Sequence, residues 1–348
     1  MALPNGLEIN HDDFINFLSR GRTVAEISQR FSITPEQVKE ILKERTPKES
    51  ELFSSRNELN QPIFLLLPKP EKRVQKQRIW SPVMHRDERK PYLWIKMPSS
   101  SSWKKITIAP LYDIHYGAEG CDEKKFDEYI DWITKTDNVF SILGGDNLEN
   151  ALVDSPGGSI FEQLIRPHRQ VIQFEEKIAP IAHKILWALP GGHEERSKKR
   201  SDIDPLWFIC RNLGIPYYNQ PIFADILWEG HVFSFYCHHG ITNSRTEGGK
   251  LNAANRPLAY TEFTMFYIMG HVHDEVTNPS IRICRERKFN ENGNLLEWRL
   301  VEKEQYVVIA PAFYKYWGTY AARAGYFPPS TGAVACILYA NGNYEASS

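Results

Sequence analysis

Five short apolar runs in this chain are each followed at once by side chains that can bind a metal ion. The runs are 105–111, 139–143, 183–189, 231–237 and 265–270. Segments with helical periodicity lie between them, at 122–135, 159–182 and 202–213. This alternation predicts an α/β layered fold. Because the carboxyl ends of strands in an α/β sheet form a common edge, we expect the five polar clusters to converge in one place.

The clusters contain two aspartates, a glutamate, several imidazoles and closely placed glycines. In chain order they read Asp113-Ile-His115, Gly-Gly-Asp146-Asn147, Gly-Gly-His193-Glu194, His238-His239-Gly240 and His271-Val-His273. Such a ligand set, without paired cysteines, suits Mn²⁺, Fe²⁺ or Zn²⁺. A carboxylate can also bridge two ions about 3.5–4 Å apart, an arrangement that activates water against phosphorus. A lone histidine is usually a packed or surface residue, but five such clusters at five strand ends predict a metal centre.

The order DxH, GD, GxHE, HG and GHxH resembles that of the calcineurin-like metallophosphoesterases, over about residues 104–340. The pattern is most similar to nuclease-type members, which include DNA repair exonucleases and the proofreading small subunit of archaeal family D polymerases. Similar two-part proteins are common in bacteriophage genomes. The resemblance implies a two-sheet sandwich flanked by helices, with the metal site at its edge.

The resemblance also implies a dinuclear centre, with manganese first and iron, zinc or magnesium as alternatives. The implied ligands are Asp113, His115 and His273 for the first ion, Asp146 as the bridge, and His239 and His271 for the second. His193 would contact the scissile phosphate and protonate or stabilise the leaving oxygen. Glu194 is expected to fix the orientation of His193, and Glu149 is an alternative for that role.

One position departs from the family pattern. The third motif of the family has Asn before its His, and that Asn is normally a ligand of the second metal, whereas this chain has Gly192. Water or a neighbour such as Asn147 can replace the ligand, the enzyme can work largely with one ion, or the domain can be a non-catalytic scaffold. We favour catalysis with reduced metal affinity.

Polar residues that follow the motifs are candidates for substrate contacts. These candidates are Arg196, Lys198, Asn243 and Arg245. A solvated helix start explains the first two equally well. In the predicted 159–182 helix, the residues expected to face the core are Phe161, Leu164, Ile165, Val171, Ile172 and Phe174.

Residues 1–45 predict a helix-turn-helix module, with Thr34 as a helix cap before Pro35. The module carries six Lys/Arg against seven Asp/Glu, so it lacks the basic excess typical of DNA-binding surfaces. DNA binding and protein docking both remain open for it.

Residues 46–102 are interpreted as a linker and 103–348 as the metallophosphoesterase domain. Between 68 and 96, nine Lys/Arg stand against three acids, interleaved with Trp80, Tyr92 and Trp94. This composition suits a nucleic-acid backbone and stacked bases. A short hairpin packed on the main domain is the alternative.

The function that these features favour is a metal-dependent phosphodiesterase acting on DNA, as an exonuclease. A phosphatase or phosphodiesterase for a small metabolite or nucleotide is the alternative enzyme, and a catalytically weakened scaffold that binds DNA or protein is the third hypothesis. No signal peptide is visible and no apolar stretch is long enough to span a membrane, so we expect a cytoplasmic protein, in the host if it is phage-encoded. Whether the chain forms a homodimer or binds another protein stays open.

Overall fold

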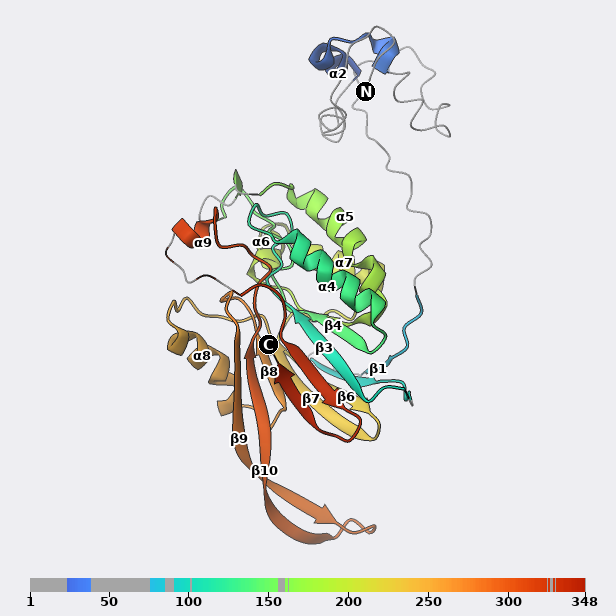
Figure 1. The fold of residues 1–348 in the computed structure, drawn as a ribbon, viewed down its shortest axis with the longest axis vertical. Coiled ribbons are helices and arrows are strands. Elements are labelled where there is room, and N and C mark those ends of the chain that lie inside the picture. The colour runs from blue at the N-terminus through green and yellow to red at the C-terminus, as the bar shows by residue number, and fades with distance from the viewer. Residues whose placement is uncertain are drawn as a thin grey trace. The chain divides into compact units, whose positions relative to one another are not determined.

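The computed structural model describes residues 24–38, 76–84, 91–100, 102–155, 160–161, 163–323, 325, 328 and 330–347 (Figure 1). The chain divides into two compact units, Met1–Val74 and Gln75–Ser348. Among the described residues, no helix is both long and apolar enough to cross a membrane.

In the first unit, helix α2 (Val24–Phe31) is followed by a turn and a second helical segment at 35–38. The Thr34 hydroxyl accepts a hydrogen bond from the Gln37 backbone N–H at 3.2 Å, and the Gln37 side chain accepts one from the Thr34 N–H at 2.8 Å. This reciprocal cap agrees with the expected helix start at Thr34. The rest of the predicted helix-turn-helix lies outside the described residues.

The second unit is built on two mixed sheets. The larger has the order β1 (Ser81–Met84), β2 (Tyr92–Lys96), β6 (Ile222–Trp228), β7 (His231–His238), β8 (Phe266–Met269), β10 (Leu295–Ile309), β9 (Val276–Phe289). The smaller has the order β12 (Tyr344–Ser347), β11 (Ala335–Tyr339), β3 (Lys105–Leu111), β4 (Val139–Leu143), β5 (Ile185–Ala188). Strands β3, β4 and β5 run in parallel, as do β7, β8 and β10, so their carboxyl ends point the same way within each sheet.

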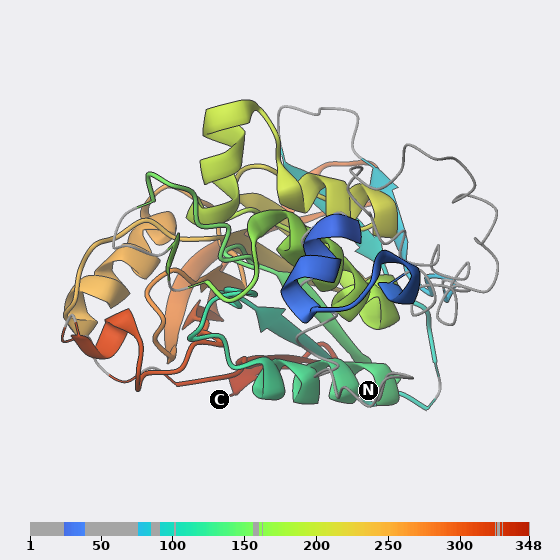
Figure 2. The same ribbon diagram turned by 90° about the horizontal axis from the view of Figure 1, so that it is seen from above.

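Helices cover the outer faces of both sheets (Figure 1; seen from above in Figure 2). The described helices of this unit are α4 (Glu123–Lys135), α5 (Pro167–Ile178), η4 (Ala179–Lys184), α6 (Gly192–Ser201), α7 (Pro205–Leu213), α8 (Glu247–Asn255), η5 (Arg256–Ala259) and α9 (Tyr320–Arg323). Residues of α4, α5 and α7 share an apolar cluster with the small sheet, and α8 shares one with the large sheet. The prediction of an α/β fold with two sheets flanked by helices is confirmed at this level.

Strand β8 shows why the sequence has continuous apolar runs in place of alternating ones. Phe266 and Ile268 face the core between the sheets, whereas Tyr267 and Met269 pack with α8 on the other side. A strand that is buried on both faces needs apolar side chains at every position.

The main unit begins earlier than residue 103. Strand β2 pairs in parallel with β6, and Leu93, Ile95 and Trp80 belong to the core between the sheets. The Trp80 indole is therefore not available to stack on bases. Trp94 and Tyr92 both donate hydrogen bonds to Asp225, so the described part of this segment is packed on the main unit.

The expectation that Phe161 and Leu164 face the core is wrong. They are 91% and 74% exposed, because α5 starts only at Pro167 and both residues precede it. Within the helix, Phe174 and Ile178 are the buried apolar residues.

Candidate metal centre

The side chains that follow five strands meet at one edge of the sandwich. Three groups have ligand atoms within 4.8 Å of one another, and these are Asp113–His115–His273, His115–Asp146–His193 and Asp146–His239–His271. The residues come from the loops after β3, β4, β5, β7 and β8. The predicted convergence of the strand ends is therefore confirmed, and the protein has buried Asp and His groups positioned to hold a metal ion.

Most of these residues have a left-handed backbone conformation. The φ angles are 50° at Asp113, 51° at His115, 49° at Asp146, 72° at His271 and 49° at His273. A non-glycine residue in this region costs about 1–3 kcal/mol and persists where surrounding contacts fix it. Here the loops after β3 and β4 brace each other, because the Asp113 N–H donates to the Gly145 carbonyl and the His115 N–H donates to that of Asp146. Such concentrated strain is typical of functional sites.

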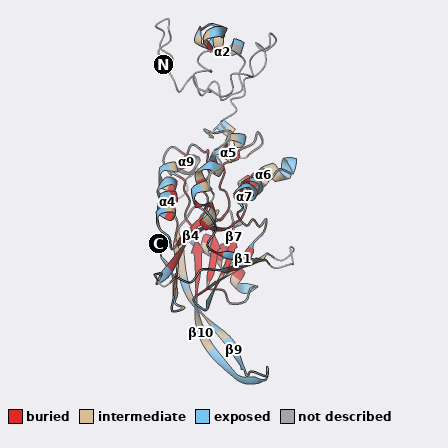
Figure 3. Cartoon of the chain, turned by 90° about the vertical axis from the view of Figure 1, so that its right-hand side faces the viewer, coloured by how far each residue is buried: buried red, intermediate tan, exposed pale blue. Residues whose placement is uncertain are grey.

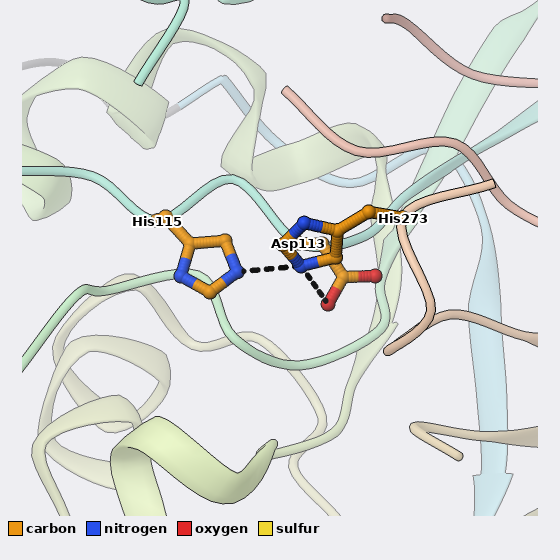
Figure 4. Close-up of side chains that lie close together, drawn as sticks. All are labelled: Asp113, His115 and His273. Carbon is orange, nitrogen blue, oxygen red and sulfur yellow. Dashed lines mark hydrogen bonds and ion pairs between the residues drawn. The ribbon is translucent and has the colours of Figure 1, made fainter. Parts of the chain in front are cut away.

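The first group consists of Asp113, His115 and His273, whose side chains point toward one another (Figure 4). His115 Nδ1 lies 3.1 Å from a carboxylate oxygen of Glu149. A carboxylate only accepts, so Nδ1 carries a proton and Nε2 is the nitrogen turned toward the other residues of the group. That Nε2 lies 3.0 Å from His273 Nε2, which is 3.6 Å from Asp113 Oδ1. Three ligand atoms thus surround a single point.

The second group repeats this arrangement with Asp146, His239 and His271. His239 Nδ1 donates to the Gly144 carbonyl at 3.1 Å, and Nε2 lies 3.2 Å from Asp146 Oδ2. Burial opposes the charged form, but Asp146 raises the pKa of this imidazole to about 10, so Nε2 faces the carboxylate with a proton that a metal ion would displace. A histidine held at one nitrogen by a backbone carbonyl or carboxylate presents the other nitrogen to a metal. Asp146 belongs both to this group and to the group with His115 and His193.

The charges of the site fit a cation. Asp113 is fully buried, and burial raises the pKa of its carboxyl to about 7. Its Oδ1 has no hydrogen-bond partner among the described residues. Burial opposes ionisation of Asp146 as well, but His239 and His193 hold its pKa well below the usual value. Two buried carboxylates with an acceptor left unpaired are costly without a counter-ion, so these residues suit one or two divalent cations.

His193 belongs to the remaining group, with His115 and Asp146, and its imidazole is neutral. Burial lowers the pKa of its imidazole to about 4. Nδ1 donates to the Glu149 carbonyl at 2.7 Å, and Nε2 accepts a hydrogen bond from the Arg196 guanidinium at 2.9 Å. Nε2 is also 3.8 Å from Asp146 Oδ2. The ring is therefore fixed in one tautomer, with Nε2 turned toward the ligand groups.

The expected contact between Glu194 and His193 is wrong. The Glu194 carboxylate accepts hydrogen bonds from the backbone N–H groups of Asp146, Asn147, Leu148 and Gly191, at 2.7–3.1 Å. Both oxygens are used in this way, so the side chain joins two motif loops and does not orient His193. Glu149, the alternative, is the residue that orients His193. Its backbone carbonyl accepts the hydrogen bond from His193 Nδ1, and one of its carboxylate oxygens lies 3.5 Å from the same nitrogen.

Gly192 is the first residue of α6 and borders a pocket of about 340 Å³. Pocket walls include Pro190, His239, Ile241 and His271, which places the pocket beside the second ligand group. A Cβ built at Gly192 would meet no atom within 4 Å. The position thus has room for the missing Asn side chain. Asn147, the neighbour considered as its replacement, directs its amide nitrogen to Glu194 at 3.4 Å.

The candidate substrate residues are dispersed. Arg196 contacts His193, as described above. Lys198 is paired with Asp204 at 3.6 Å. Asn243 and Arg245 are exposed on the loop between β7 and α8, and neither lines the pocket. The structure therefore brings only Arg196 to the ligand groups.

Tyr314 is a site residue that the sequence reasoning missed. Its ring contacts those of His115 and His273, with centroid distances of 5.3 and 5.7 Å. It follows β10, which runs parallel to β8, so the rule that pointed to the other strand ends applies to this one too. The segment after β10 that contains Tyr314 has no cluster of acidic residues or histidines, so the sequence did not mark it as part of a site.

No protein-family model matches this chain, and no curated protein matches it.

Proposed function

We propose that this protein is a metal-dependent phosphodiesterase and that its substrate is DNA. The observation that carries the proposal is the pair of Asp/His ligand groups, Asp113–His115–His273 and Asp146–His239–His271, beside a neutral, oriented His193. Divalent ions in such a centre act as Lewis acids on a phosphoryl oxygen and supply a nucleophile from water near neutral pH.

The protein's own residues would hold and orient the phosphate. The Arg196 guanidinium, which contacts His193 Nε2, is a cationic donor beside the ligand groups. A phosphodiester that enters there would take this guanidinium as its partner and leave Nε2 of His193 facing the leaving oxygen. Because Nδ1 stays bound to the Glu149 carbonyl, the ring keeps the orientation that proton donation to the leaving oxygen requires.

Helix α6 supports a polyanionic substrate. It begins at Gly192, beside the second ligand group, and its last turn contains Lys198, Lys199 and Arg200. Basic side chains that follow a catalytic site can hold successive phosphates of a nucleic acid backbone. These basic side chains now pair with Asp204, Glu195 and Asp154. On binding, each of them would exchange its carboxylate partner for a phosphate of the substrate.

The pocket beside the second ligand group favours one alternative substrate class. Its volume of about 340 Å³ falls in the range of pockets that hold small molecules. A nucleotide or small phosphodiester is therefore the second candidate.

The test is Mn²⁺-dependent hydrolysis of end-labelled single- and double-stranded DNA and of a small chromogenic phosphodiester. We expect DNA cleavage that EDTA abolishes and that Asp146→Asn lowers at least about a hundredfold. Asp131→Asn is the matched control, because this exposed carboxylate on α4 pairs only with Lys135 among the described residues. Hydrolysis of the small diester alone would favour the second candidate. Turnover of neither substrate with any divalent metal would refute the proposal.

A further inference from the structure

Strands β9 and β10 extend beyond the sandwich as a two-stranded ribbon (Figure 1). β10 pairs with β8 only over Tyr306–Ile309, whereas its pairing with β9 continues outward to Leu295. The outer part of the ribbon therefore has no further strand beside it among the described residues. Isolated two-stranded ribbons are marginally stable in water, so a long one benefits from a partner surface.

One face of this ribbon, here called the apolar face, has an unusual composition. Cross-strand pairing places on it Ile281, Ile283, Arg285, Arg287 and Phe289 from β9, and Leu295, Trp298, Leu300, Glu302 and Glu304 from β10. Its apolar side chains are between 44% and 72% exposed. Figure 3 shows the same ribbon as largely exposed, in contrast to the buried strands of the sandwich. A contiguous exposed apolar surface of this kind marks an interaction site.

The apolar face continues the interior of the protein. The next residues of β10 on the same side, Tyr306 and Val308, lie in the core between the two sheets. The small sheet covers them there but does not extend along the ribbon (Figure 1). The apolar face is thus a continuation of the surface that the small sheet buries in the core, and it extends beyond the edge of that sheet.

The charges on this face are arranged so that a second copy would match them. Glu302 and Glu304 lie near the base of the ribbon, whereas Arg285 and Arg287 lie nearer the tip. Neither Arg285 nor Glu302 has an ion-pair partner in the described part of the chain. Consider two copies packed face to face through this surface, related by a two-fold axis that lies in the interface and is perpendicular to the strands. If the axis passes between the Ile283–Glu302 and Arg285–Leu300 pairs, the second ribbon runs in the opposite direction to the first. Each Arg285 then lies level with Glu302 of the other copy.

We propose that the apolar face of the β9–β10 ribbon is the self-complementary interface of a homodimer. The two-fold arrangement is isologous, since the same patch serves both copies. Within this interface, toward the tip of each ribbon, the Arg287 guanidinium stacks on the Trp298 ring at 4.4 Å from the centroid, and interface hot spots are enriched in both residue types. The axis also brings the tip of each ribbon, with Phe289 and Leu295, level with the base of the other. A pocket of about 530 Å³ lined by Tyr306 and Tyr344 lies at that base.

Charge favours a second copy over nucleic acid as the occupant. Residues 276–309 carry six Lys/Arg against five Glu, so the ribbon has no basic excess. A surface that binds nucleic acid needs an excess of basic residues. Separate acidic and basic blocks on one face suit association with a second copy of that face.

The test measures the mass of the full-length protein by sedimentation equilibrium over a range of concentrations. We expect a dimer whose dissociation constant rises more than about tenfold in Arg285→Glu and in Glu302→Arg, because each change places like charges opposite one another. An equimolar mixture of the two variants restores both ion pairs across the axis, so we expect the heterodimer to form with near wild-type affinity. Both side chains are exposed, and circular dichroism checks that each variant is folded.

Lys288→Glu is the matched control, because Lys288 pairs with Glu297 on the opposite face of the same ribbon. We expect this change to leave the dimer intact. A monomeric wild-type protein would overturn the proposal. So would a dimer that Arg285→Glu and Leu300→Lys leave unchanged, or a mixture that shows no recovery. None of these readouts depends on phosphodiesterase activity.

Discussion

Glu194→Gln tests how the protein joins the loop of residues 146–148 to the loop that contains Gly191. The substitution keeps the size of the side chain and removes one acceptor oxygen. In the native protein Oε1 accepts from the backbone N–H groups of Asn147 and Leu148, and Oε2 accepts from those of Asp146 and Gly191. Whichever way the amide is turned, its NH₂ group faces two N–H donors.

The expected cost follows from these contacts. Two buried N–H groups lose their acceptor, and each loss costs about 1–3 kcal/mol. Burial and the nearby Asp146 raise the pKa of Glu194, and the backbone N–H donors oppose that shift, so part of the desolvation cost is recovered on removing the charge. We therefore expect a net loss of about 3 kcal/mol in the free energy of unfolding, which lowers the melting temperature by about 6–12 °C. The loop that carries Asp146 would also shift, so metal binding should weaken.

Differential scanning calorimetry and titration calorimetry with Mn²⁺ measure the two effects. Glu195→Gln is the control, because this neighbour on α6 pairs only with Lys199 among the described residues. A Glu194→Gln protein that matches the control in melting temperature and in Mn²⁺ affinity would refute the view that Glu194 joins the loops.

Three further predictions concern the metal site and the fold. Gly192→Asn places an amide in open space beside the second ligand group, so we expect its affinity for Mn²⁺ to rise about tenfold by titration calorimetry, and an unchanged or lower affinity would contradict this. Mn²⁺ at a hundred times its dissociation constant should stabilise the protein by about 2.7 kcal/mol in thermal scans, with EDTA reversing the effect and Asp146→Asn abolishing most of it. Lys184 donates to the carbonyls of Ile133 and Thr136 at the end of α4, at 2.7 and 2.6 Å, so Lys184→Met should lower the free energy of unfolding in urea by about 2–3 kcal/mol, whereas the exposed Lys135→Met should change it little.

Local sequence patterns predicted the main elements well where they were uniform. The runs 105–111 and 139–143 coincide with β3 and β4. Strand β6 was missed, although Ile222, Ala224, Ile226 and Trp228 alternate on its buried side. Its polar positions and the lack of a motif after it weakened the signal. The prediction that Phe161 and Leu164 face the core failed, because an apolar side chain does not by itself show that its residue belongs to a helix.

The sequence by itself determined which side chains stand at the ends of the strands, because that depends only on where apolar runs stop. Their order and chemistry were enough to predict a shared site for Asp113, His115, Asp146, His239 and the two histidines after β8. The tertiary structure decided which acid supports His193 and which joins the loops, since Glu149 is 44 residues from His193 in the sequence and Glu194 is 48 residues from Asp146. It also decided the left-handed conformations at the site, because only bracing between separate loops can hold non-glycine residues there.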